Sequence, residues 1–390
     1  MSNEEGSKQF DKWLTDDSEF AALVMRQWLE PIEGKDAVIF PPTYAKPERA
    51  KEDWLGYNID GDGDSSVCQI DSVGSQANRM EPIFKRDKYK QFVPQIIIKA
   101  TSEGKERTVD LLDAGHRGAD SIVRFSELGP ELHEAFRNYR DQGNAEPLAK
   151  IAPTSIVFGS WDSRATQAKL PRIVRSVIRA YNVRVLHRSA QYSTIAGEIL
   201  ESGDVEVTTK GPKAELGLAH VPAVWTHGGV QVLGEIRRDA ILKLETIRAL
   251  AGPDKGASLR LRRYVLGLAL VCFTAPPEIT LREGCELVPD PKRPVEWRLV
   301  KHDGTRADGA ITHDQAFIFA TAAAKEFGVE DSLNFAVFDS GLVKAVMALK
   351  EDDRKKLFKQ GPVTKEKIEK LNKESKSKGK TKDLAEEAQS

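Results

Sequence analysis

The chain has 390 residues, of which 40% are hydrophobic and 30% are charged, and its formal net charge at pH 7 is −1. This composition is typical of a soluble globular protein. Because the net charge is close to zero, the chain does not attract anions through its overall charge. There is no apolar run of about 18 residues, and the first residues are polar, so we expect no membrane contact and a cytoplasmic location. The three cysteines, Cys68, Cys272 and Cys285, fit neither a disulfide framework nor a paired-cysteine metal site.

Hydrophobic periodicity predicts helices and strands that interleave along the chain without a repeat of fixed period. A helix is predicted from Asp17 or Ser18 to about Glu30, because a capping residue precedes apolar residues at helical spacing. The Gly- and Asp-rich stretch 46–66 is predicted to be a loop. The other predicted elements are strands over 37–40, 93–99, 107–112, 155–158 and 183–191, helices over 119–127, 131–140, 235–250, 314–327 and 342–349, and an apolar run of undecided type over 264–273.

The segment 163–197 is unusual because it contains cations but no Asp or Glu. At helical spacing, the apolar residues of 169–181 fall on one side and the cations on the other, so an amphipathic basic helix is predicted. These cations have no acid three or four residues away and are therefore available to bind phosphate groups. An ordinary solvated surface helix is the alternative, but the missing acids favour an anion partner, and nucleic acid is the leading candidate. The cations are Arg164, Lys169, Arg172, Arg175, Arg179, Arg184 and Arg188.

Three polar segments lie beside predicted strands and helices, over 71–81, 115–121 and 158–164. In part they are capping loops, in which Ser72 caps a helix through Glu81 and Asp162 or Ser163 caps the basic helix. Their arginines are also candidates for phosphate contacts, and their other polar and aromatic side chains are candidates for hydrogen bonding to or stacking on unpaired bases. The phosphate candidates are Arg79, Arg117 and Arg164, and the base candidates are Asn78, His116 and Trp161.

Sequence motifs of common enzymes and metal sites are incomplete. Gly379-Lys380-Thr381 resembles the end of a phosphate-binding loop, but position 374, where the first glycine belongs, is Glu. The run 60–64 resembles a calcium loop without the required glycine or bidentate glutamate at the right spacing. We therefore predict no catalytic residues, no metal and no cofactor.

Several segments, taken in this order, resemble a known family. They are Pro41-Pro42-Thr43-Tyr44-Ala45, the string 71–81, His116-Arg117-Gly118-Ala119-Asp120, and 158–164 followed by Lys169-Leu170-Pro171-Arg172. Together they resemble the backbone subunit of the type I-G (formerly I-U) CRISPR Cascade complex, a family of the RAMP superfamily. The resemblance spans roughly residues 20 to 350, and Gly74 departs from it because a larger polar residue is expected there.

This resemblance implies an α+β fold, with a modified RNA-recognition-motif (ferredoxin-like) core and large insertions that form finger and thumb extensions. Residues 201–234 are the candidate thumb. The implied function is a non-catalytic subunit whose copies bind along one CRISPR RNA as a helical filament, leaving its bases free to pair with target DNA. The implied partners are CRISPR RNA, target DNA through guide pairing, further copies of the chain, the large subunit and the fused RNA-processing subunit of Cascade, and the recruited helicase-nuclease.

A sequence-independent RNA cradle needs many cations and few side chains that read bases, which agrees with the basic segment. The predicted RNA-binding residues are Asn78, Arg79, His116, Arg117, Arg164, Lys169, Arg172, Arg175 and Arg179, with Trp161 as a possible base-stacking residue.

Two other functions remain open. One is a metal-dependent RAMP-type endoribonuclease with Asp71, Asp120 and Asp162 as candidate carboxylates, although each of these has an equally good capping role. The other is a protein–protein scaffold whose basic helix docks an acidic protein. In domain terms, residues 1–350 are predicted to form the backbone subunit and 351–390 a charged, disordered tail with a short helix around 365–373.

Overall fold

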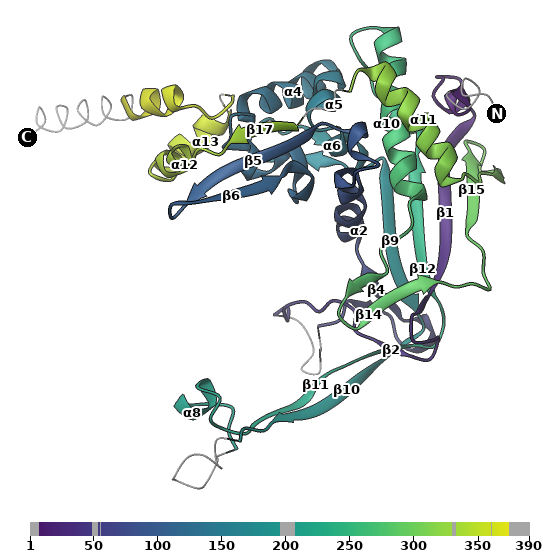
Figure 1. Cartoon of the computed structure of the whole chain (residues 1–390), viewed down its shortest axis with the longest axis vertical. Coiled ribbons are helices and arrows are strands. Elements are labelled where there is room, and N and C mark those ends of the chain that lie inside the picture. The colour runs from purple at the N-terminus through teal and green to yellow at the C-terminus, as the bar shows by residue number, and fades with distance from the viewer. Residues whose placement is uncertain are drawn as a thin grey trace, which may run out of the picture.

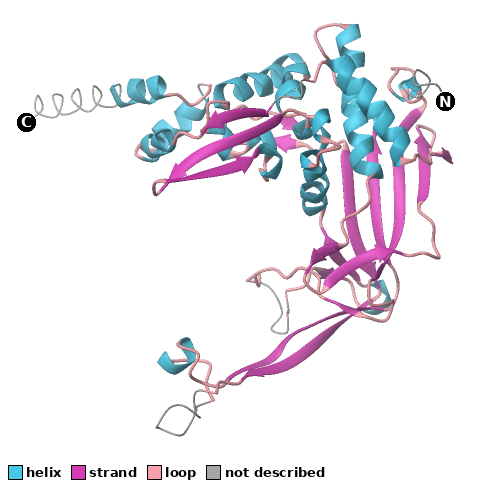
Figure 2. Ribbon diagram, viewed as in Figure 1, coloured by secondary structure: helices cyan, strands magenta, loops and turns pink. Residues whose placement is uncertain are grey.

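The computed structural model describes residues 8–48, 54, 56–195, 207–329, 333–359 and 361–373. A large sheet covered by helices forms one side of the molecule, and a smaller sheet with its own helices lies beside it (Figure 1). A long two-stranded arm projects from the lower end of the large sheet in this view, away from the helices, so that the outline resembles a letter C. Helices and strands are mixed along the chain (Figure 2), and the predicted α+β class is confirmed.

The large sheet has four central strands, β1 (Phe20–Pro31), β9 (Val174–Tyr181), β12 (Ile236–Lys243) and β15 (Glu296–Lys301). They lie in the order β15–β1–β12–β9, and each is antiparallel to its neighbours. Helices lie between β1 and β9 and between β12 and β15 in the chain, whereas β9 leads to β12 through the arm. This is the strand order of a split βαβ unit, the ferredoxin-like arrangement. The sheet is extended by β3 (Ile59–Asp60), β4 (Val67–Asp71), β13 (Thr280–Arg282), β14 (Cys285–Pro289) and β16 (Arg306–Asp308).

Helices α2 (Val73–Met80), α10 (Lys255–Thr274) and α11 (His313–Phe327) cover one face of this sheet (Figure 1). The apolar run of undecided type is the centre of α10, which is buried almost all round because it lies between the sheet and α11. Gly267 allows this close packing, since a Cβ atom there would lie 2.9 Å from the Cα of Ala320 in α11.

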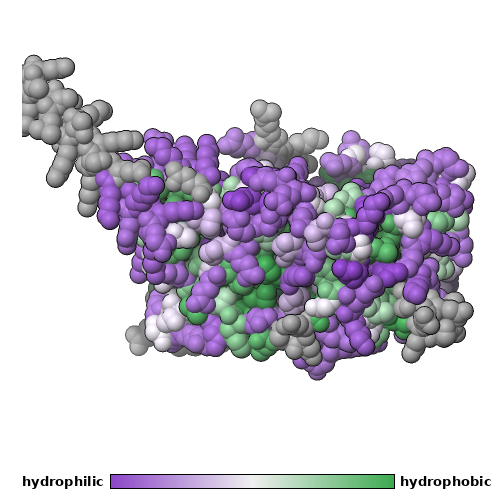
Figure 3. Space-filling view, turned by 90° about the horizontal axis from the view of Figure 1, so that it is seen from above, coloured by the Kyte–Doolittle hydropathy of each residue, from purple (hydrophilic) through white to green (hydrophobic). Residues whose placement is uncertain are grey.

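The smaller sheet consists of β5 (Gln95–Ser102) between β6 (Lys105–Asp110), which is antiparallel to it, and β17 (Leu333–Val337), which is parallel. The helices near it are α3 (Ser121–Arg124), α4 (Gly129–Gln142), α5 (Glu146–Ile151), α6 (Thr154–Val157) and α12 (Ser340–Met347). From above, most of the visible surface is hydrophilic, with hydrophobic patches between the polar side chains (Figure 3). Within the described ranges, no helix is long and apolar enough to cross a membrane.

The arm is a hairpin of β10 (Val183–Tyr192) and β11 (Val221–Val232), with α8 (Pro212–Glu215) near its tip. Its base is anchored by β2 (Val38–Ile39), which pairs with β11. Of the candidate thumb over 201–234, residues 201–206 lie outside the described residues. The rest contains α8 and β11, so the candidate thumb corresponds to the second half of the arm.

Many predicted elements are confirmed, but several apolar segments have the other secondary structure. The helix predicted to end at Glu30 is β1, because Leu23, Met25, Gln27 and Leu29 alternate inward at the period of a strand. The strand predicted over 155–158 is the single turn α6, and the helix predicted over 235–250 is β12 followed by α9 (Leu244–Arg248). Four predicted strands are confirmed as β2, β5, β6 and β10, which correspond to 37–40, 93–99, 107–112 and 183–191. Three predicted helices are confirmed as α4, α11 and α12, which correspond to 131–140, 314–327 and 342–349. The helix predicted over 119–127 is shortened to α3.

The predicted basic helix is also wrong. Residues 169–181 form β8 (Lys169–Leu170) and then β9, whose inward side chains alternate with outward ones. The apolar pairs in this segment fit a helical stripe and a buried strand equally well, and the β-branched Ile173, Val174, Val177 and Ile178 favour the strand. The cations of this segment therefore do not share one helical face.

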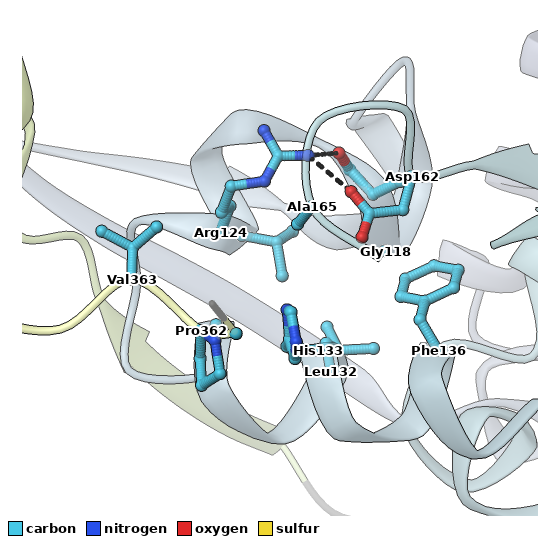
Figure 4. A pocket seen from close by; sticks show the side chains of 13 residues that line it. Gly118, Arg124, Leu132, His133, Phe136, Asp162, Ala165, Pro362 and Val363 are labelled. Atoms are coloured by element: carbon cyan, nitrogen blue, oxygen red, sulfur yellow. Dashed lines mark hydrogen bonds and ion pairs between the residues drawn. The ribbon is translucent and has the colours of Figure 1, made fainter. Parts of the chain in front are cut away.

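The described part of the predicted tail is folded. It contains α13 (Glu351–Lys359) and a helix over 365–373, and Leu357, Val363, Ile368 and Leu371 are buried against α12. Pro362 lies beside His133 of α4, around a cavity of only 20 Å³ (Figure 4). The short helix around 365–373 is as predicted, whereas the rest of 351–373 differs from a disordered tail. The prediction for 374–390 lies outside the described residues.

Candidate functional site

Six of the ten predicted residues line one pocket of 670 Å³, here called the Trp161 pocket. Its walls are the short 3-10 helix Arg117–Ala119, the two-stranded ribbon of β7 (Ser160–Trp161) and β8, and the residues around them. The segments 115–121 and 158–172 are thus brought together, although about 40 residues separate them in the sequence. The predicted residues in this pocket are His116, Arg117, Trp161, Arg164, Lys169 and Arg172.

The ribbon that presents Trp161 is fixed by Asp162. This carboxylate is buried and accepts hydrogen bonds of 2.8 Å from both the backbone nitrogen and the hydroxyl of Thr166. It also forms an ion pair with Arg124, at 2.9 Å (Figure 4). These contacts fix the backbone next to Trp161 on the buried side of the loop. The indole of Trp161 is 58% exposed beside the pocket. Asp162 therefore organises the loop and does not cap a basic helix.

Three cations of the Trp161 pocket have no acidic partner among the described residues. Arg164 and Lys169 are exposed and form no ion pair there, and the Lys169 Nζ atom lies 5.8 Å from the Trp161 ring centroid. The Nη1 atom of Arg172 is buried and has no hydrogen-bond partner among the described residues. An uncompensated buried N–H donor is costly, so this group favours an anionic ligand.

Arg117 has an internal role. Its side chain is 4% exposed, and its Nε atom lies 2.7 Å from a carboxylate oxygen of Glu81, which is also buried. It donates a hydrogen bond of 3.2 Å to Asn78 Oδ1, and its guanidinium lies 5.2 Å from the Phe158 ring centroid. Burial raises the pKa of Glu81 to about 7, and the charge of Arg117 opposes this shift. The structure therefore places Asn78, which does not itself line the Trp161 pocket, in contact with Arg117 of its wall.

Arg79 lies at a second pocket, on the other side of Asn78. It forms ion pairs with Asp71, at 3.1 Å, and with Glu278, at 3.2 Å. Ser72 caps α2 by accepting a hydrogen bond from the backbone nitrogen of Ser75, as the sequence predicted. Asp71 and Ser72 thus fix the helix that carries Asn78 and Arg79.

Arg175 and Arg179 lie apart from the other predicted residues. On β9, Ser176 points towards α2 and donates a hydrogen bond of 2.7 Å to Gln76. Side chains alternate along a strand, so Arg175 and Arg179 point to the opposite face of the large sheet. That face also carries ion pairs, including Arg26 with Asp239 at 3.3 Å. The structure therefore does not bring these two arginines to the Trp161 pocket.

The arm carries a group of basic and aromatic side chains that the site prediction did not include. His187 of β10 stacks on Trp225 of β11 with ring centroids 3.9 Å apart, and Trp225 is 63% exposed. Arg184 and Arg188 are exposed on the same strand as His187. The signal in the sequence is the continuation of the basic segment to Arg188, whereas no local pattern connects these cations to Trp225.

The three candidate carboxylates of a ribonuclease have internal partners. Asp71 accepts hydrogen bonds from Gln76 and Arg79, and Asp162 is held as described above. Asp120 caps α3 and also accepts a hydrogen bond of 3.1 Å from the backbone nitrogen of His116. Within the described residues, no three His, Cys, Asp or Glu side chains are grouped so as to hold a metal ion.

Residues 23–185 match the family model described as CRISPR-associated protein GSU0053. The matched region includes most of β1, all of α2, the whole Trp161 pocket and all ten predicted residues, and it ends near the start of the arm. The match indicates a CRISPR-associated protein family for this part of the chain. No curated protein matches the chain.

Proposed function

We propose that the chain is a non-catalytic CRISPR RNA-binding backbone subunit of a type I-G Cascade complex. The observation that carries this proposal is the Trp161 pocket, in which an exposed indole lies beside three cations without acidic partners among the described residues. An exposed aromatic face stacks on an unpaired base, and arginine and lysine bind the neighbouring phosphates. The family match supports the CRISPR setting.

The chemistry of the pocket favours binding that does not depend on RNA sequence. Arg164, Lys169 and Arg172 present charge to phosphates, and an indole accepts any base because every base has a π face. A guide held in this way keeps its base-pairing edges free, so that target DNA is recognised by the RNA itself.

The fold supports membership of the RAMP superfamily and assembly of several copies. The β15–β1–β12–β9 order fits a modified RNA-recognition motif, and the arm, whose second half is the candidate thumb, is inserted between β9 and β12. On the arm, Tyr192, Val224 and Trp225 are more than half exposed, and one face of Trp225 stacks on His187. We assign these side chains to contacts with RNA or with a neighbouring copy.

The proposal is tested by RNA binding of the purified full chain. Trp161→Ala is expected to weaken binding of a fluorescent single-stranded RNA roughly tenfold, because base stacking on an aromatic side chain contributes about 1–3 kcal/mol. Fluorescence anisotropy at fixed salt measures this loss.

Trp297→Ala is unsuitable as a control because Trp297 packs against Phe273. The control is instead Arg306→Gln, which changes an exposed cation on β16. Equal RNA affinity for Trp161→Ala and the native chain would contradict the assignment of the pocket. Cleavage of the RNA in the presence of magnesium would contradict the non-catalytic role.

A further inference from the structure

The second pocket, here called the Arg238 pocket, has a volume of 320 Å³. It lies between α2, the 3-10 helix Glu81–Lys85 and the segment 275–278 that follows α10. Asn78 borders it and also contacts Arg117, which lines the Trp161 pocket, so the two pockets lie on either side of the Arg117–Asn78 contact. Its size is at the lower end of the range for small-molecule sites in proteins.

Arg238 is the most deeply buried cation at this pocket, at 3% exposed. It is on β12, at a position that faces the helices, and its Nε atom donates a hydrogen bond of 3.0 Å to the hydroxyl of Ser176. Its Nη2 atom has only the weak acceptor Met80 Sδ, at 3.5 Å. A guanidinium has five N–H donors. Among the described residues, the Nη1 atom of Arg238 has no hydrogen-bond partner. Because Arg238 lines the pocket, the Nη1 donors are available to a ligand there.

The charges around the pocket leave an excess of positive charge. Asp71 is the acid whose charge acts on Arg238, and one oxygen of that carboxylate already accepts hydrogen bonds from Gln76, at 2.6 Å, and Arg79, at 3.1 Å. Burial lowers the pKa of Arg238 to about 10, so the group stays cationic at neutral pH. Arg86 adds an exposed cation at the rim, while Glu278 is the second acid. Three arginines thus face two carboxylates.

We propose that the Arg238 pocket binds a phosphate group, with Arg238 as the buried donor and Arg79 and Arg86 at the rim. A guanidinium binds phosphate oxygens in pairs, and the apolar walls formed by Met80 and Ile83 strengthen the attraction by excluding water. The site goes beyond the proposed function, because either a phosphate of a bound strand or the phosphate of a free nucleotide has the chemistry that it recognises.

The test is isothermal titration of the full chain with inorganic phosphate, 5′-AMP and adenosine at low salt. The titrations use the Trp161→Ala chain as well as the native chain, so that stacking of the base in the Trp161 pocket is removed. In that variant, saturable binding of 5′-AMP with a stoichiometry of one, and none of adenosine, is expected. Arg238→Met is expected to weaken 5′-AMP binding at least about tenfold, because hydrogen bonds to a charged group contribute about 1.5–3 kcal/mol. Equal binding of 5′-AMP and adenosine, or no binding of either phosphate compound, overturns the proposal.

Two surface variants test the site if Arg238→Met does not fold. Glu278→Gln removes the acid that is paired with Arg79 and is expected to tighten 5′-AMP binding several-fold, whereas Arg86→Gln is expected to weaken it. Both side chains are exposed, so neither change disturbs the core. Unchanged affinity in both variants overturns the proposal.

RNA competition identifies the source of the phosphate and separates this site from the proposed function. Displacement of 5′-AMP by single-stranded RNA supports a phosphate of the bound strand, and simultaneous binding supports a free nucleotide. Trp161→Ala is expected to weaken RNA binding while leaving the affinity for 5′-AMP unchanged. If the native chain binds 5′-AMP but no RNA, the proposed function fails and the phosphate site stands.

Discussion

The buried ion pair between Glu81 and Arg117 lies beside the Trp161 pocket, which Arg117 lines, and Arg117 also contacts Asn78 of the Arg238 pocket. Glu81 is 1% exposed, and its second carboxylate oxygen has no hydrogen-bond partner among the described residues. A buried ion pair adds little net stability when it is complete, because both charges lose their hydration. Removal of one partner is costly, since the other charge stays buried without compensation.

Glu81→Ala is therefore expected to lower the free energy of unfolding by about 3–5 kcal/mol, whereas the double variant Glu81→Leu with Arg117→Met recovers most of this loss. Urea unfolding followed by circular dichroism measures both values. Glu134→Ala is the control, because Glu134 is half exposed and forms an ion pair of 3.4 Å with Arg137 within α4. Equal destabilisation by the two single variants would show that the Glu81 pair has no special structural role.

At the scale of secondary structure elements, the basic segment is divided between the loops that flank β8 and the strand β9, and this division decides which cations act together. Arg164 and Arg172 line the Trp161 pocket, whereas Arg175 and Arg179 point to the other face of the sheet. An RNA strand in the pocket therefore contacts the first pair and not the second.

Two double variants with equal loss of charge test this division. Arg164→Gln with Arg172→Gln is expected to weaken binding of single-stranded RNA and to reduce the slope of log affinity against log salt by about 1.4, since each phosphate contact with a single strand contributes about 0.7. Arg175→Gln with Arg179→Gln is expected to leave the slope nearly unchanged. Anisotropy titrations at several salt concentrations measure both, and the reverse ranking would place the RNA on the open face of the sheet.

The elements also show what could be predicted from the sequence. Long amphipathic helices such as α4 and α11 were predicted correctly, because the apolar stripe in their sequence is the face that packs against the rest of the protein. β1 and β9 were predicted as helices because their apolar residues fit both periods, and only pairing with other strands decides between them.

The sequence predicted part of the candidate site, namely the residues in polar loops, and missed the buried arginine. The segments around His116 and Trp161 are polar loops, so their residues were recognisable as candidates wherever the chain folds. Arg238 was missed because it is a charged residue at an inward position of a strand, which hides the alternation in β12. No local pattern indicates that a single arginine is buried beside a pocket.

At the scale of the whole molecule, the near-zero net charge is compatible with RNA binding because the charges are segregated. In the segment 163–197 every Asp, Glu, Lys or Arg position is a Lys or an Arg, and acidic residues elsewhere in the chain balance their charge. The large sheet, the smaller sheet and the arm lie around one open side in Figure 1, and the segment that forms part of the Trp161 pocket continues into the arm. This arrangement fits a subunit that holds an extended strand and reaches towards a neighbour.

The most direct test of RNA binding by this chain is its co-expression with its presumed partner subunits and a CRISPR array. The purified particle is analysed by size-exclusion chromatography, absorbance ratio and sequencing of the bound nucleic acid, before and after RNase or DNase treatment. Our account predicts a large particle that contains guide-length RNA and falls apart with RNase but not with DNase. A monomer free of nucleic acid, or an assembly that forms without RNA and survives RNase, would contradict it.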